Sequence, residues 1–202
     1  MKNILIATNN KGKAEELRKI FKGTNFNVKF LFDFPETRCL DIIEDADSFK
    51  GNALIKAKIV GDKLDIITLA DDSGICVDYL NDAPGIYSAR YSKEGDDKSN
   101  YEKLLTELDG VPFEERNCYY RCAAVIYDPK TKFVSTSFGD WHGKVATEPR
   151  GSKSFGYAPV FLAREFNYKK TNAECNHDDL IEINHRGKAF RQAIDTLEEY
   201  LK

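Results

Sequence analysis

The chain has 202 residues, with 30 lysines and arginines against 33 aspartates and glutamates, and its formal net charge is −3. A general nucleic-acid coat protein needs an excess of basic residues to replace the counterions around phosphates, so this balance argues against one and leaves room only for a local cationic pocket. Hydrophobic residues make up 42% and aromatic residues 12% of the chain. That is enough apolar surface for one full core, so we expect a single domain over residues 1–202.

The sequence also predicts a protein of the cytoplasm. No apolar run approaches the ~20 residues that span a bilayer, and the start MKNILIATNN turns polar too early for a secretory signal. We therefore expect no membrane and no nucleic-acid partner. The cysteine count is odd and contains no C-x-x-C pair, which predicts reduced thiols rather than disulfides or a zinc site. The five cysteines are Cys39, Cys76, Cys118, Cys122 and Cys175.

Hydrophobic periodicity and turn signals predict an α/β fold. Strands alternate with helices early in the chain and cluster in its middle, which is typical of a mixed central sheet with flanking helices. In chain order we expect a strand at 3–8, a helix at 13–21, strands at 27–32 and 66–70 around a helix at 49–64, a helix at 98–108, an antiparallel hairpin of strands 118–127 and 132–142, a loop at 151–157 and a helix at 186–201.

The first segment with chemical potential is ATNNKGK, residues 7–13. A polar, glycine-containing turn that leaves a strand and enters a helix points backbone N–H groups and a lysine at one spot, which suits an anionic phosphate. The spacing is not that of a P-loop. The alternative is an ordinary strand-to-helix turn with an asparagine cap.

The second segment is ADDSG, residues 70–74, directly after the strand expected at 66–70. Two adjacent carboxylates at the end of a buried strand are costly unless a metal or an acid/base task uses them. In a strand-like stretch Asp71 and Asp72 point to opposite faces, so they need not share one task. A solvated, aspartate-rich turn is the alternative.

Two later segments could recognise a nucleotide. PRGSKSFGYAPVF, residues 149–161, contains aromatic side chains that could stack on a nucleobase or could equally be core anchors. NHRGK, residues 184–188, brings a histidine and an arginine to the start of the last helix. These groups suit base edges or phosphates, and a surface helix start is the alternative.

Taken together, the segments resemble the inosine/xanthosine triphosphate pyrophosphatase family, and the resemblance covers nearly the whole chain in one order. The family motif T-x-N-x-x-K falls on Thr8, Asn10 and Lys13, and F-x-E-N-A-x-x-K-A falls on Phe49, Asn52, Ala53, Lys56 and Ala57. A-D-D-S-G falls on Ala70 to Gly74, P-G-x-Y-S-A-R-Y on Pro84 to Tyr91, and P-R-G on Pro149 to Gly151. F-G-Y falls on Phe155 to Tyr157, and H-R-G-K-A on His185 to Ala189.

The resemblance implies a role for each matching residue. Asp72 would activate a water and hold Mg²⁺, and Lys13 and Lys56 would grip the triphosphate, with Thr8 and Asn10 in the phosphate-binding segment. Ser73 would touch the substrate, and the residues that would surround the purine are Phe155, Gly156, Tyr157, Asn184, His185 and Arg186. The family fold is an elongated, two-lobed α/β structure with a central cleft, usually a homodimer. Mg²⁺ and lysines would offset polyphosphate charge while a carboxylate orients water.

The chain departs from the family at two places. Ala158 replaces the aspartate of F-G-Y-D-P, and Leu180 and Asn184 stand where the family has a lysine and a serine, at positions that face the nucleobase in the family. Losing those polar groups would alter base discrimination. Gly51 replaces the glutamate of F-x-E-N-A, so Glu44 is the nearest candidate for a second metal ligand.

These departures leave three hypotheses for the function. The chain is a Mg²⁺-dependent pyrophosphatase of (d)ITP or XTP, or a pyrophosphatase with changed or relaxed base choice, or a nucleotide-binding regulator without catalysis. The pocket departures favour changed or relaxed base choice, with Asn184 reading a new base edge as both donor and acceptor. The intact ADDSG segment with Lys13 and Lys56 favours an enzyme over a regulator.

Overall fold

The computed structural model describes residues 2–37, 40, 42–153, 155–176 and 180–202. The chain divides into two compact units. The first unit comprises Met1–Asp72, Cys122–Gly139 and Arg186–Lys202, and the second comprises Ser73–Arg121 and Asp140–His185. The chain passes from one unit to the other four times, and the prediction of a single domain over residues 1–202 stays a prediction.

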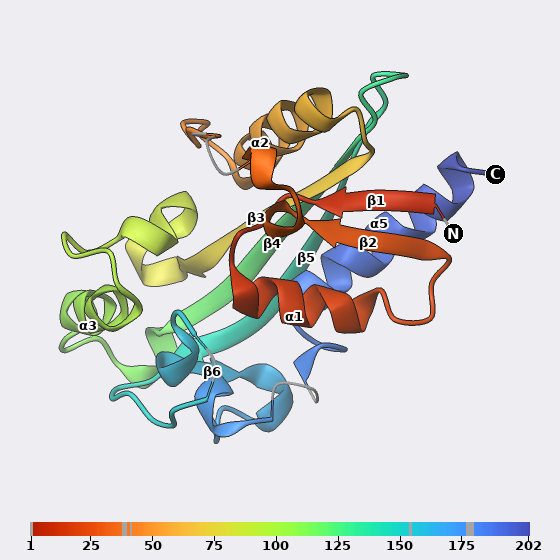
Figure 1. Ribbon diagram of the computed structural model, residues 1–202. Helices are drawn as coiled ribbons and strands as arrows, with labels where there is room; N and C mark the ends of the chain where they lie inside the picture. The colour runs from red at the N-terminus through yellow and green to blue at the C-terminus, as the bar shows by residue number, and fades with distance from the viewer. Residues whose placement is uncertain (1, 38–39, 41, 154, 177–179) are drawn as a thin grey trace. The chain divides into compact units, whose positions relative to one another are not determined.

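Among the described residues, six strands form one sheet in the order β2-β1-β3-β4-β5-β6. β1 pairs in parallel with both β2 and β3, and β5 pairs antiparallel with β6, so the sheet is mixed. Helices flank it, and the predicted α/β class with a mixed central sheet is confirmed (Figure 1). The strands are β1 (Lys2–Ile6), β2 (Phe26–Phe30), β3 (Thr68–Val77), β4 (Asn117–Tyr127), β5 (Val134–Val145) and β6 (Phe161–Ala163).

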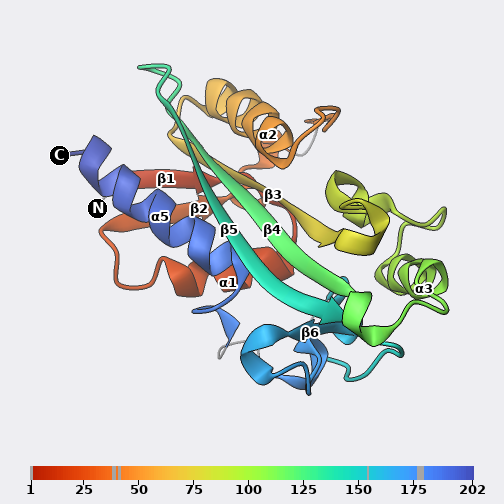
Figure 2. The same cartoon turned by 180° about the vertical axis from the view of Figure 1, so that it is seen from behind.

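The first unit buries both faces of its strands. Residues of β1 alternate: Ile4 and Ile6 enter a core with α1 (Lys11–Ile20) and α5 (His185–Tyr200). Leu5 enters a second core with α2 (Phe49–Leu64). The alternation follows from the two-residue period of a strand. One helix therefore covers one face and two helices cover the other (Figure 2).

The second unit has a core of its own around Trp141, Phe161 and Leu104, all of which are almost fully buried. Leu104 comes from α3 (Asp97–Glu107), whose N-cap Asp96 accepts a hydrogen bond from the backbone N–H of Ser99. Short 3-10 segments connect much of the remainder. This core packs the segment that follows ADDSG.

The strand expected at 66–70 runs further along the chain than predicted, and the alternative that ADDSG is a solvated turn is wrong. β3 runs from Thr68 to Val77, so Asp71, Asp72, Ser73 and Gly74 lie inside the strand. The charges are tolerated there because cationic and amide side chains meet them, as described below. The rule that neighbouring strand residues face opposite sides therefore applies directly to the two aspartates.

Other predicted elements agree to within a few residues. The helix at 49–64 has the predicted bounds, while the strand predicted at 27–32 ends at Phe30 and continues as a 3-10 turn, Leu31–Asp33. β4 and β5 are adjacent in the sheet and are joined by a tight turn in which the N–H of Asp128 donates to the carbonyl of Phe133. β6 was not predicted, because three residues give too short a pattern.

The described cysteines are all free thiols: Cys76, Cys118, Cys122 and Cys175. Cys39 lies outside the described residues. Burial raises the pKa of the Cys76 thiol to about 11, which keeps it protonated at neutral pH. Among the helices of the described residues, none is both long and apolar enough to cross a membrane.

Candidate active site

The two aspartates of ADDSG face different helices of the first unit. Leu69 belongs to the core beneath α1 and α5, and Ala70 to the core beneath α2. Strand residues two positions apart face the same side of the sheet. Asp71 therefore lies on the face of Leu69, beneath α1 and α5, and Asp72 lies on the face of Ala70, beneath α2. Each carboxylate therefore has its own set of partners.

Asp71 is the centre of a buried ion network. It is 2% exposed, and its Oδ2 lies 2.8 Å from Nζ of Lys13 in α1 and 3.4 Å from Nε of Arg186 in α5. Arg186 also donates to Oε2 of Glu16 at 2.7 Å. Burial alone would raise the pKa of Asp71, but the charges of Lys13 and Arg186 outweigh it and hold that pKa below its ordinary value. Asp71 is therefore ionised and committed to these partners.

Asp72 lies among the polar side chains of α2. Its Oδ2 accepts a hydrogen bond of 3.1 Å from Nδ2 of Asn52. Burial, and more weakly the charge of Glu44, raise the pKa of Asp72, while Asn52 and the charge of Lys56 oppose the rise. A carboxylate with a raised pKa that stays within reach of solvent suits a general base. The structure thus distinguishes Asp72 from its neighbour.

Lys56 and Glu44 form an ion pair on the same side of the first unit. Nζ of Lys56 lies 2.8 Å from Oε1 of Glu44, and both side chains are partly buried. The Lys56 charge also acts on Asp72. The predicted residues Asp72, Lys56 and Glu44 are therefore within electrostatic reach of one another, together with Asn52, to which the sequence had assigned no role.

The donor set suits Mg²⁺ of the kind that arrives with a polyphosphate. Mg²⁺ is usually held by one or two carboxylates, with water and substrate oxygens completing its octahedron. Asp72 and Glu44 supply two carboxylates whose like charges act on each other. Within the described residues there is no cluster of three or more His, Cys, Asp or Glu side chains arranged for a metal. Asp72 and Glu44 are thus the described carboxylates that could hold such an ion.

The segment at residues 7–13 has the geometry of a capped helix start. Asn10 is the N-cap of α1, and its Oδ1 accepts from the backbone N–H of Lys13 at 3.0 Å. Oγ1 of Thr8 accepts from the N–H of Asn10. The alternative interpretation as an asparagine-capped turn is confirmed, and the same turn directs Lys13 to Asp71. Phosphate binding by Thr8 and Asn10 stays a prediction.

Gly51, where the family has glutamate, packs too closely for a side chain. A Cβ atom added at Gly51 would lie 2.5 Å from Cβ of Ala46 and 3.1 Å from Oγ of Ser48, the N-cap of α2. The segment before α2 thus leaves no space for a side chain at this position.

We therefore expect Gly51→Glu to lower the free energy of unfolding by about 1–3 kcal/mol, because the new side chain overpacks the start of α2. Urea denaturation measures the change. Lys50→Glu, at an exposed neighbouring position, is the control and should change stability by less than about 0.5 kcal/mol. Equal stability of Gly51→Glu and wild type would show that the segment opens freely to admit the family's glutamate.

The base-recognition residues predicted from FGY lie in the second unit. Phe155 and Gly156 are half-buried, and Tyr157 is 4% exposed within the core of that unit. The hydroxyl of Tyr157 donates to the carbonyl of Ser88 at 2.8 Å. Tyr157 is therefore an anchor as well as a candidate contact, and its role against a purine stays a prediction. Ser73, the first residue of the second unit, is half-buried.

The departures at the base loop are apolar residues in apolar surroundings. Ala158 is 0% and Leu180 is 1% exposed, and Leu180 belongs to the core of the second unit. An aspartate or a lysine at these buried positions would be a charged group that needs a partner of opposite charge.

The segment NHRGK is not a surface helix start, so that alternative is wrong. Asn184, His185 and Arg186 are all at least nine-tenths buried. The His185 ring stacks on Tyr120 with centroids 4.7 Å apart, in the second unit. Arg186 belongs to the first unit, where it pairs with Glu16 and Asp71. A role for these residues around the purine stays a prediction.

Sequence reasoning missed several partners in these networks. Glu16 lies three residues after Lys13 in α1, a spacing that places both on one helix face. That spacing was a usable signal. Asp97 accepts a hydrogen bond of 2.7 Å from the N–H of Gly156, 59 residues away in the chain. No sequence pattern predicts a contact over that separation.

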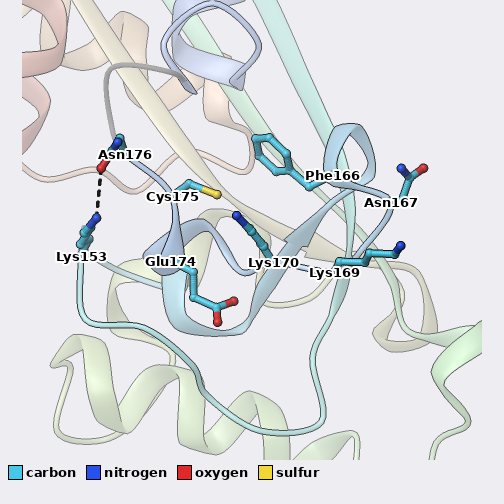
Figure 3. A pocket seen from close by; sticks show the side chains of 8 residues that line it. All are labelled: Lys153, Phe166, Asn167, Lys169, Lys170, Glu174, Cys175 and Asn176. Carbon is cyan, nitrogen blue, oxygen red and sulfur yellow. Dashed lines mark hydrogen bonds between the residues drawn. The ribbon is translucent and has the colours of Figure 1, made fainter.

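The second unit also contains an open pocket of about 400 Å³, shown in Figure 3. At its rim Nζ of Lys153 donates to Oδ1 of Asn176 at 3.0 Å. Among the described residues that line it, none is a predicted site residue. Its lining is Lys153, Phe166, Asn167, Lys169, Lys170, Glu174, Cys175 and Asn176.

Comparison with known proteins agrees with this arrangement of motifs. The Ham1 family matches residues 4–196. The chain belongs to the Ham1 family. The dITP/XTP pyrophosphatase of Bacillus cereus is 38% identical over 202 residues, covering 99% of this chain and 97% of that protein. The dITP/XTP pyrophosphatase of Bacillus subtilis is 39% identical, covering 98% of each. The resemblance to inosine/xanthosine triphosphate pyrophosphatases is thereby confirmed.

Solved structures of the Ham1 family have the same fold. A HAM1 protein from Coxiella burnetii superposes with a TM-score of 0.87 at 30% identity, covering 98% of this chain and 100% of that one. The Ham1 protein of Staphylococcus aureus gives 0.85 at 31% identity, with the same coverage. Membership of the Ham1 family thus rests on sequence and fold together.

Proposed function

We propose that this chain is a Mg²⁺-dependent dITP/XTP pyrophosphatase, which hydrolyses a non-standard purine nucleoside triphosphate to the monophosphate and pyrophosphate. The observation that carries the proposal is the set of partners around Asp72, namely Asn52, Lys56 and Glu44. Relatives named dITP/XTP pyrophosphatases that match nearly the full chain support it.

The side chains of the first unit have different roles at the phosphates. Lys13 and Lys56 supply positive charge for the triphosphate, and each is held by a carboxylate at 2.8 Å in the free protein. Asp72 takes the proton of the attacking water, and the amide of Asn52 fixes the orientation of its carboxylate. Asp71 acts through Lys13, which it positions. The site is thus preorganised before substrate arrives.

Mg²⁺ would be held by Asp72 and Glu44 and would offset charge on the phosphate oxygens. Glu44 pairs with Lys56 in the free protein, so a bound metal would compete for that carboxylate. The competition leaves Lys56 available for a phosphate.

The base loop of the second unit, Phe155 to Tyr157, together with Asn184 and His185, would recognise the purine. His185 is preoriented by its stack on Tyr120. The relatives do not favour the alternatives of changed base choice or of a regulator without catalysis, because their names specify dITP and XTP. We therefore keep dITP and XTP as the expected substrates.

A panel of triphosphates tests the function. We expect pyrophosphate release from dITP and XTP at least about tenfold faster, in kcat/KM, than from dGTP or dATP, and loss of release when EDTA removes the divalent metal. Comparable release from every base would indicate relaxed choice. Binding of every triphosphate without release would support the regulator instead.

The reaction partners and compartment follow the same proposal. The expected partner is the nucleoside triphosphate itself, and the expected assembly is a homodimer, which sedimentation equilibrium would test. The cytoplasm, which holds the nucleotide pool, is the compartment we propose.

A further inference from the structure

Two side-chain hydrogen bonds fasten the base loop to the second unit. The N–H of Gly156 donates to Oδ2 of Asp97 at 2.7 Å, and the hydroxyl of Tyr157 donates to the carbonyl of Ser88 at 2.8 Å. Gly156 adopts a left-handed φ of 64° with no atom near its missing Cβ. Because glycine has the widest conformational freedom, the backbone conformation at Gly156 depends on a hydrogen bond to a residue outside the loop.

Asp97 is itself held in a defined place. It is the first residue of α3, next to the N-cap Asp96, whose Oδ1 accepts from the N–H of Ser99 at 3.0 Å. Asn100, only 2% exposed, accepts from the N–H of Ser92 at 2.7 Å and donates to the carbonyl of Ala89. The carboxylate of Asp97 is thus presented by a fixed helix start.

The second anchor leads back to the strand that contains ADDSG. Oγ of Ser88 accepts from the N–H of Ile75 in β3 at 3.0 Å and donates to the carbonyl of Gly85 at 2.6 Å. Ser88 therefore fixes the carbonyl that receives Tyr157. Tyr157 is thus anchored by its own side chain and Gly156 by Asp97, and these are the two residues that directly follow Phe155.

We propose that Asp97 is a positioning residue for nucleobase recognition: its carboxylate fixes Gly156 and thereby the direction of the Phe155 ring. This inference rests on the proposed function, since it takes Phe155 as a contact of the base. A charged acceptor makes the bond to the N–H stronger than a neutral one would. Without the Asp97 carboxylate the loop must become ordered when the base binds, and the entropy lost in that ordering weakens binding.

The test compares Asp97→Ala, Asp97→Asn and the control Glu102→Ala. Glu102 is an exposed acid on the same helix, paired only loosely with Lys98 at 3.7 Å, so its removal matches the change in charge. We expect Asp97→Ala to raise KM for dITP about tenfold with kcat within about twofold. Asp97→Asn keeps an oxygen acceptor and should recover most of the loss. Glu102→Ala should leave both constants near those of wild type.

Inorganic tripolyphosphate separates positioning from a merely structural role. It offers phosphates and no base, so its inhibition constant should be the same for wild type and Asp97→Ala, while KM for dITP rises. A parallel rise of both, or an unchanged KM with a lowered melting temperature, would overturn the proposal.

Failure of the proposed function gives a different result. If wild type releases no pyrophosphate from any triphosphate, the function is wrong, and calorimetric dissociation constants for dITP then replace KM in the same comparison. A tenfold weaker constant in Asp97→Ala would still support positioning, and an unchanged constant would overturn it. Faster amide exchange at Gly156 in Asp97→Ala is expected in either case.

Discussion

Replacing Asp72 with asparagine should lower turnover of dITP by about 10²- to 10⁴-fold, because the amide cannot accept the proton of the attacking water. The hydrogen bond from Asn52 can still be made to the remaining oxygen, so the fold around α2 should persist. Binding of the triphosphate should survive, since Lys13 and Lys56 are untouched. Single-turnover pyrophosphate release and calorimetry measure the two quantities separately.

Asp45→Asn is the matched control for this experiment. Asp45 is an exposed aspartate next to Glu44 in the same acidic stretch, and we expect its variant to turn over dITP within about twofold of wild type. Near-normal turnover of Asp72→Asn would remove Asp72 from the mechanism. A large loss in Asp45→Asn instead would move the metal or the base to that segment.

The second large effect concerns stability. Arg186→Met should lower the free energy of unfolding by about 3–5 kcal/mol, because it removes a cation that pairs with two buried carboxylates, Glu16 and Asp71. Glu16 and Asp71 are 1% and 2% exposed, so water cannot replace the lost partner. Urea denaturation with a linear extrapolation measures the change.

An exposed ion pair supplies the comparison. Lys130 lies 3.6 Å from Asp65 with both side chains about 70% exposed, and Lys130→Met should cost less than about 1 kcal/mol. Adding Glu16→Gln to Arg186→Met should restore part of the loss, since it removes the buried charge with which Arg186 pairs. Equal costs for Arg186→Met and Lys130→Met would show that the network around Asp71 contributes nothing beyond a surface pair.

Much of the fold and part of the site could be read from local patterns. The helix at 49–64 was predicted with its observed bounds, and strand alternation at once separated Asp71 from Asp72. The sequence predicts the end of this strand at residue 70 and leaves a turn at ADDSG open as the alternative, because aspartate and glycine favour turns locally. Pairing within the sheet and the cations that reach Asp71 override that preference.

The sequence alone determined the family and the alternating faces of β3, and it supplied the candidate site residues, since these depend on spacing along the chain. Only the tertiary structure decided the partners. Arg186 meets Asp71 across 115 residues and Asp97 meets Gly156 across 59. Local propensity carries no information about such pairs, because they form only when packing of the strands and helices brings distant segments together. That packing turned two adjacent aspartates into one structural anion and one candidate base.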